Sequence, residues 1–192
     1  MAEPIVGLLR THPLEAWSDA FAALPDSVGV TVEPFVAMVD VRISDPAVWP
    51  GVDLPTTPNT WVPIDTGRAI WLGPDEWLLT STAEAPDELE ARVRAAVVPL
   101  GGSAADVSAQ RITVRLVGER VRDVLAKGCA IDLHPRVFGR GRCAQTTLGL
   151  AGVVLLALSD TGDDYLVLVR SSFAGYLADW LLDAACEFTG RP

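Results

Sequence analysis

Few side chains in this sequence could carry out chemistry, and those few are widely spaced. The chain has two histidines and three cysteines. Cys129, His134 and Cys143 are the nearest approach to a zinc site, but no Cys-x-x-Cys pair accompanies them. A structural zinc site needs about four nitrogen or sulfur ligands in close pairs. Two buried thiols and one hydrogen-bonded or exposed imidazole are the favoured interpretation.

Catalysis by a nucleophile or by paired carboxylates has equally little support. A catalytic triad needs a histidine beside an activated serine or cysteine. His134 is the internal candidate, but it is followed by Pro135 and Arg136, and no nucleophile-elbow motif is present. The acidic pairs Asp75-Glu76 and Asp163-Asp164 fall in predicted turns, where solvated charge is the ordinary role. The sequence predicts no catalytic residue in this chain.

Cofactor-binding motifs are also missing. A phosphate-binding loop needs closely spaced glycines between a strand and a helix, and neither Gly101-Gly102 nor Gly139-Arg140-Gly141 has that spacing. Trp71, Trp77 and Trp180 could stack a flat ligand such as a pterin or a flavin. Core packing is the favoured role for each, with a subunit contact second. We therefore expect no cofactor and no metal in this chain.

One row of polar residues stands out from this background. Asp132, His134 and Arg136 alternate along the linker 127–138, so they share one side of an extended chain. Such a row could form charge-assisted hydrogen bonds with a partner surface. Alternatively, the same groups could bond internally and fix the linker across a sheet. Both interpretations stay open, and the three residues are the candidate partner contact.

Composition narrows the class of protein. The chain has 192 residues, a net charge of −10 and 49% hydrophobic residues. Nucleic acid and anionic lipid surfaces would repel such an acidic chain. The odd number of widely spaced cysteines favours a reducing cytoplasm over a disulfide framework. The longest apolar run, 148–158, is about half the length of a membrane span, and no signal peptide is recognised, so no membrane association is expected.

Hydrophobic periodicity predicts the elements that must position these residues. Apolar residues at helical spacing predict helices over residues 14–24, 86–98, 118–127 and 171–188. Alternating apolar residues predict strands over 28–32, 35–43, 61–64, 69–72, 77–80, 104–108, 112–117, 144–150, 153–158 and 165–169. Gly73–Glu76 predicts a hairpin turn, and the proline-rich segment 44–59 predicts an ordered loop or a single helical turn.

This order of elements predicts an α+β fold with mostly antiparallel sheets and helices packed on one face. We expect an N-terminal helix and extension over 1–34 and a main domain over 35–192. The main domain has two possible lobes, 35–128 and 129–192, joined by the linker.

Five co-linear motifs carry a resemblance to a known family. They are Thr57–Thr60, Trp71–Leu79, Lys127–Phe138, Cys143–Thr146 and Trp180–Ala184. In this order, over roughly residues 35–188, the chain resembles the gamma subunit of heterotetrameric sarcosine oxidase. Ala130 stands where proline is expected in the Lys-Gly-Cys-x-x-Asp-Leu motif. This replacement of proline by alanine relaxes the backbone there.

The resemblance implies a complex of alpha, beta, gamma and delta subunits. Such a complex oxidatively demethylates sarcosine to glycine, with hydrogen peroxide and either formaldehyde or methylenetetrahydrofolate as further products. FAD, FMN and NAD are expected in the alpha and beta subunits, zinc in delta, and tetrahydrofolate in the partner subunits. Gamma is implied to be an accessory, non-catalytic subunit, with alpha as its direct partner. Its fold is implied to be similar to the folate-binding domain of the aminomethyltransferase family of the glycine cleavage system.

Two other functions compete with this one. A stand-alone folate- or pterin-binding protein is the alternative, because the implied fold can hold a pterin. An independent hydrolase that uses His134 and a cysteine is the third and has the least support.

Overall fold

The computed structural model describes residues 11–49 and 52–190, which form two five-stranded antiparallel sheets. Sheet A has the order β1-β7-β10-β9-β8, and sheet B has the order β3-β4-β5-β2-β6. The strands are β1 (Gly29–Glu33), β2 (Ala37–Arg42), β3 (Trp61–Ile64), β4 (Gly67–Gly73), β5 (Glu76–Ser81), β6 (Ser103–Asp106), β7 (Arg111–Val117), β8 (Cys143–Leu148), β9 (Ala151–Ala157) and β10 (Asp164–Arg170).

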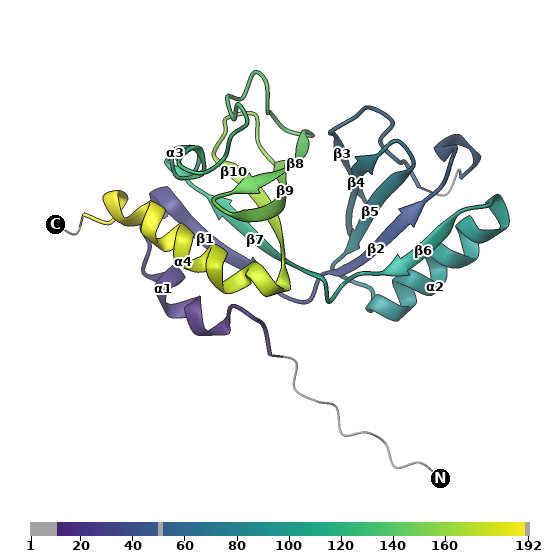
Figure 1. Ribbon diagram of the computed structural model, residues 1–192, viewed down its shortest axis with the longest axis horizontal. Coiled ribbons are helices and arrows are strands. Elements are labelled where there is room, and N and C mark those ends of the chain that lie inside the picture. The colour runs from purple at the N-terminus through teal and green to yellow at the C-terminus, as the bar shows by residue number, and fades with distance from the viewer. Residues whose placement is uncertain (1–10, 50–51, 191–192) are drawn as a thin grey trace, which may run out of the picture.

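Each sheet is covered by helices on the side that faces away from the other sheet (Figure 1). The α-helices are α1 (Ser18–Ala22), α2 (Pro86–Val97), α3 (Val121–Ala126) and α4 (Ala174–Ala185). Single 3-10 turns are η1 (Glu15–Trp17), η2 (Asp26–Val28), η3 (Pro46–Val48), η4 (Val98–Leu100), η5 (Ser171–Phe173) and η6 (Cys186–Phe188). None of the helices in the described part of the chain has both the length and the hydrophobicity of a membrane span.

The outer face of sheet A forms the largest core. Alternate residues of its strands, such as Val114, Leu155 and Val167, pack against Leu125 of α3 and Leu177 of α4. The helical stripe that predicts the last helix supplies these contacts, because residues three and four apart lie on one side of a helix. Burial of this apolar surface is the main stabilisation of the sheet-helix unit.

The outer face of sheet B is covered by α2 and by the loop before β3, which contributes Trp49 and Leu54. Leu89, Val93 and Val97 of this helix are fully buried against Val39 and Leu79. The predicted hairpin is confirmed, because β4 and β5 pair across Gly73 and Glu76 with Trp71 opposite Trp77. In the proline-rich segment, where the structure describes residues 44–49 and 52–59, the single helical turn is confirmed as η3 (Pro46–Val48).

The inner faces of the two sheets meet in a third apolar cluster. Leu156 and Leu166 of sheet A face Ile70, Leu72 and Leu78 of sheet B. Backbone hydrogen bonds join the sheets beside this cluster. Those bonds run from Trp61 N to Gly141 O (2.8 Å) and from Cys143 N to Asn59 O (2.9 Å). The α+β prediction of antiparallel sheets with helices on one face is therefore confirmed for each sheet.

The sheets divide the chain differently from the expected lobes. Sheet A takes β1 and β7, whereas the whole of sheet B lies between them in the sequence. The expected boundary at 128/129 falls inside the sheet A unit, and the segment 127–142, which contains the linker 127–138, joins α3 to β8 within that unit. The N-terminal segment also contributes a strand to sheet A, because Gly29–Glu33 pairs with β7. Local periodicity identifies the strands, but it does not say which strands share a sheet.

Candidate functional site

The predicted polar row lies on the surface, in a turn. Asp132, His134 and Arg136 are exposed, whereas Leu133 and Phe138 anchor the segment in the core of sheet A. Asp132 Oδ1 accepts a hydrogen bond from the backbone N–H of His134 at 2.8 Å, and His134 Nδ1 accepts one from the N–H of Arg136 at 3.2 Å. These bonds are local, so they shape the turn and do not cross the sheet. The row stays a candidate partner contact.

The cysteines and His134 do not form a reactive group. Cys143 lies between the sheets, where burial raises the pKa of its thiol to about 12. Its Sγ lies 3.7 Å from the backbone oxygen of Trp71. A thiol with such a pKa is protonated at neutral pH and is a poor nucleophile. Within the described residues, no group of three or more histidine, cysteine or acidic side chains could hold a metal ion.

The tryptophans have structural surroundings. Trp77 is fully buried, and its Nε1–H donates to the backbone oxygen of Pro55 at 2.8 Å. Trp61 lies between the sheets, and its Nε1–H donates to the backbone oxygen of Ala157 at 3.0 Å. Trp180 packs against the core of sheet A from α4. Core packing accounts for all three.

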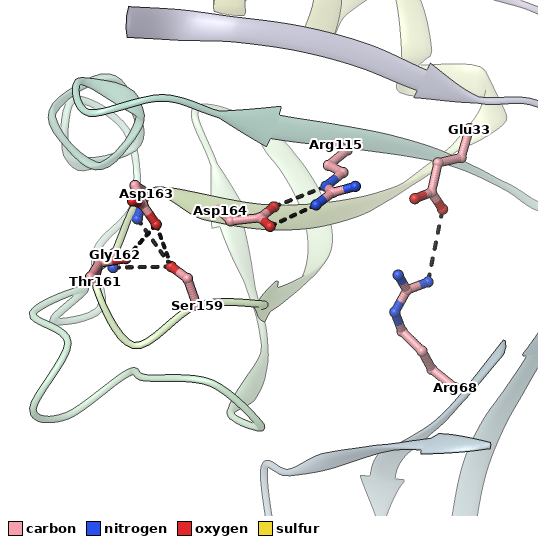
Figure 2. Close-up of polar contacts among 8 residues, drawn as sticks. All are labelled: Glu33, Arg68, Arg115, Ser159, Thr161, Gly162, Asp163 and Asp164. Carbon is pink, nitrogen blue, oxygen red and sulfur yellow. Dashed lines mark hydrogen bonds and ion pairs between the residues drawn. The ribbon is translucent and has the colours of Figure 1, made fainter.

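Ion pairs lie between and beside the sheets (Figure 2). Arg68 of sheet B reaches Glu33 of sheet A, with Nη1 and Oε2 3.8 Å apart. Arg115 binds Asp164 through two hydrogen bonds of 3.0 and 2.7 Å, and this carboxylate raises the pKa of Arg115. In the turn before β10, the hydroxyls of Ser159 and Thr161 each lie 2.6 Å from Asp163 Oδ1, and they lower the pKa of Asp163.

Two cavities open beside the inner face of sheet A. The first, of about 710 Å³, is lined by polar groups that include Glu33, Asp106 and Thr113. The second, of about 650 Å³, is lined by Gln145, Gly152 and Arg170 among others. Arg111 lines both cavities, and its Nη1 is buried without a hydrogen-bond partner in the described part of the protein.

Sequence reasoning missed these arginines. Arg111 and Arg170 are 59 positions apart in the numbering. Each lies one residue outside a predicted strand, 112–117 or 165–169, and at the end of the observed strand, β7 or β10. Only the pairing of β7 with β10 places them opposite one another. The available signal was strand alternation, which puts a charged residue on the face opposite to Ile112 and Val169.

The sequence matches one family over most of its length. The sarcosine oxidase gamma subunit family model matches residues 46–187. Sarcosine oxidase subunit gamma of Corynebacterium sp. strain P-1 is 33% identical over 175 residues, covering 91% of this chain and 74% of that protein. Sarcosine oxidase subunit gamma of Arthrobacter sp. is 32% identical over 191 residues, covering 94% of this chain and 92% of that one.

Solved structures agree with the sequence matches. A chain of the heterotetrameric sarcosine oxidase from Corynebacterium sp. U-96, in complex with pyrrole 2-carboxylate, superposes with a TM-score of 0.84 at 30% identity. That match covers 96% of this chain and 99% of the other. The glycine cleavage system aminomethyltransferase T from Bartonella henselae gives a TM-score of 0.61 at 14% identity, covering 90% of this chain and 50% of that protein, and shows similarity of fold alone. On these matches in sequence and structure, the chain belongs to the sarcosine oxidase gamma subunit family.

Proposed function

We propose that this protein is the accessory, non-catalytic gamma subunit of a heterotetrameric sarcosine oxidase. The observation that carries the proposal is the structural match at TM-score 0.84, which extends over 96% of this chain and 99% of a chain from such a complex. The surroundings of the cysteines and tryptophans support an accessory role, because burial and core packing account for the reactive and aromatic groups described above.

In this proposal the complex also contains alpha, beta and delta subunits, and it oxidatively demethylates sarcosine to glycine. The flavins FAD and FMN and the cofactor NAD belong to alpha and beta, zinc belongs to delta, and tetrahydrofolate binds to the partner subunits. Gamma contacts alpha directly. The three free thiols suit assembly in a reducing compartment such as the cytoplasm.

Co-expression tests this proposal. The chain is expressed with the alpha, beta and delta subunits, and the purified product is analysed by native mass spectrometry, flavin absorbance and sarcosine-dependent peroxide formation. We expect one copy of this chain in a yellow, active complex and a colourless, inactive chain when it is purified alone. An active complex that excludes this chain, or sarcosine turnover by the chain alone, would contradict the proposal.

Within that complex, we propose that the polar row contacts alpha. The row is exposed, and local hydrogen bonds hold it in one shape, so binding needs little ordering of the chain. Replacing Arg136 with alanine should weaken co-purification with alpha while the chain stays folded. Arg120→Ala is the matched control, because Arg120 is exposed, and its side chain forms a surface ion pair with Asp123 at 3.2 Å and lies 6.0 Å from the centre of the Phe188 ring.

Equal recovery of alpha with Arg136→Ala and Arg120→Ala would remove the row from the interface. The folate-binding alternative rests on fold alone, since the aminomethyltransferase match is at 14% identity. Calorimetry of the purified chain with tetrahydrofolate checks it, and we expect no heat of binding.

A further inference from the structure

Two arginines face the same open space at the end of sheet A. The register of β7 and β10 places Arg111 directly opposite Arg170. Their neighbours Ile112 and Val169 point into the helix-covered core, so both guanidiniums project from the inner face. Like charges directly opposite in an antiparallel pair are destabilising. A negatively charged group between the two arginines would remove that repulsion.

No protein group in the described part of the chain fully supplies this charge. Arg111 Nη1 is buried without a hydrogen-bond partner, and neither guanidinium has an ion pair there. Burial and Arg170 lower the pKa of Arg111, whereas Asp40 and Glu76 across the gap raise it. Glu76 is already engaged by Arg42 at 2.7 Å. Asp40 and Glu76 therefore compensate the positive charge of Arg111 only in part, and they do so from across the gap.

The space in front of the arginines is a cavity with room for an organic molecule. Its volume is about 650 Å³, within the usual range for small-ligand sites of roughly 300–1,000 Å³. Gly152 contributes to its floor, and a Cβ built there would meet no atom within 4 Å. Apolar side chains of Val154 and Leu168 line the cavity beside it. The ring of Phe173 also lines it and is 42% exposed.

We propose that this cavity binds an organic carboxylate between the guanidiniums of Arg111 and Arg170. Guanidiniums bind carboxylates through paired, charge-assisted hydrogen bonds. A single negative charge suits the site better than a phosphate dianion, because Asp40 and Glu76 lie across the gap. The exposed ring of Phe173 gives the organic part of the ligand an apolar contact that inorganic phosphate cannot use. The carboxylate comes either from a free small molecule or from an acidic side chain of another subunit.

Benzoate tests the site in the free, full-length chain, and benzamide is the matched neutral probe. Calorimetric or NMR titration should show binding of benzoate and at least tenfold weaker binding of benzamide. Arg111→Gln and Arg170→Gln should each weaken benzoate binding at least tenfold, whereas Arg120→Gln should not change it. Gly152→Leu fills the floor of the cavity and should also abolish binding with both arginines intact. Circular dichroism establishes that each variant is folded.

The co-expressed complex distinguishes the two sources of the carboxylate. If benzoate binds to the free chain and to the complex, the ligand is a free small molecule. If the arginine double variant weakens assembly at least tenfold and the complex does not bind benzoate, another subunit supplies the carboxylate. Two results would overturn the proposal, each in combination with normal assembly of the arginine double variant. The first is that benzoate binds equally well to the arginine variants, and the second is that benzoate does not bind to the chain at all. The free-chain titration needs no partner, so its failure is separate from failure of the proposed function.

Discussion

The inner face of sheet A has two ends that are built from the same strands. At the sealed end, where β8 begins and β9 finishes, Cys143, Leu156 and Leu166 are buried under sheet B. At the open end, the same three strands present Thr147, Gly152 and Arg170 to a cavity. We call these the sealed end and the open end.

The difference shows that one sheet face can serve two purposes within a few residues. Apolar residues at the sealed end provide contact area and hold the two sheets together. At the open end, glycine and paired arginines contribute little packing and leave a site for a ligand. Destabilisation should therefore be large for changes at the sealed end and small for changes at the open end, where binding should respond instead.

The largest expected effect is at the sealed end, with Trp61→Ala. The Trp61 side chain is 7% exposed, and it hydrogen-bonds to Ala157 O across the two sheets. Removing it should lower the free energy of unfolding by about 3–5 kcal/mol, the usual range for a buried aromatic residue. Urea denaturation followed by circular dichroism measures the loss.

Trp61→Phe refines this test. The ring is largely retained, but the hydrogen bond to Ala157 O is lost, so we expect a smaller loss of about 1–2 kcal/mol. A loss below about 1 kcal/mol for Trp61→Ala would show that the sealed end does not hold the sheets together.

The second prediction concerns the thiol at the sealed end. Burial raises the pKa of Cys143 to about 12, so very little thiolate exists at pH 8. An ordinary cysteine has a pKa of about 8.5, so the thiolate fraction of Cys143 should rise about a thousandfold on unfolding. Labelling with a thiol reagent should therefore be at least that much slower in the native chain than in denaturant, and mass spectrometry locates the label.

Cys186 is the internal control for this measurement. It is exposed, so it should react in the native chain as well. Equal native rates for Cys143 and Cys186 would indicate that the sealed end opens readily.

A smaller effect is expected for Asp164→Asn, which removes the ion pair with Arg115 (Figure 2). This pair is bidentate but partly exposed, with the Arg115 side chain 43% accessible. Solvent screening limits its contribution, so the free energy of unfolding should fall by about 0.5–1 kcal/mol. High salt should reduce the difference between the variant and the parent chain.

The smallest effect on stability is expected at the open end, with Gly152→Val. Its Cβ would enter open space, and valine suits a strand, so the free energy of unfolding should change by less than about 0.5 kcal/mol. Benzoate binding should nevertheless fall. A loss of more than about 2 kcal/mol would mean that the open end is packed as tightly as the sealed end.

Much of the fold could be predicted from the sequence, because local patterns determine it. The stripe along α4, the alternation in β7 and the Gly73–Glu76 hairpin are all readable within about 20 residues. The division into sheets could not be predicted in this way. It depends on β1 pairing with β7, across the whole of sheet B.

The two candidate sites also differ in whether local sequence patterns could predict them. The row Asp132, His134 and Arg136 lies within five consecutive positions of the sequence, and its exposure could be anticipated from the alternation with Leu133. Arg111 and Arg170 lie opposite one another because of the register between β7 and β10. The periodicity of a single sequence carries no information about that register. Sites assembled by register therefore need the structure.

The pairing of β1 with β7 also has a consequence for biosynthesis. Gly29–Glu33 is made long before Arg111–Val117, its first partner, whereas every strand of sheet B lies between them. At roughly 5–20 residues per second, the ribosome needs about 4–16 s to reach β7 after β1. Sheet B can therefore fold while β1, the first strand of sheet A, is still unpaired because β7 has not been synthesised. Limited proteolysis of ribosome-bound chains that end near residue 140 would show protected sheet B and cleavable β1 if this order holds.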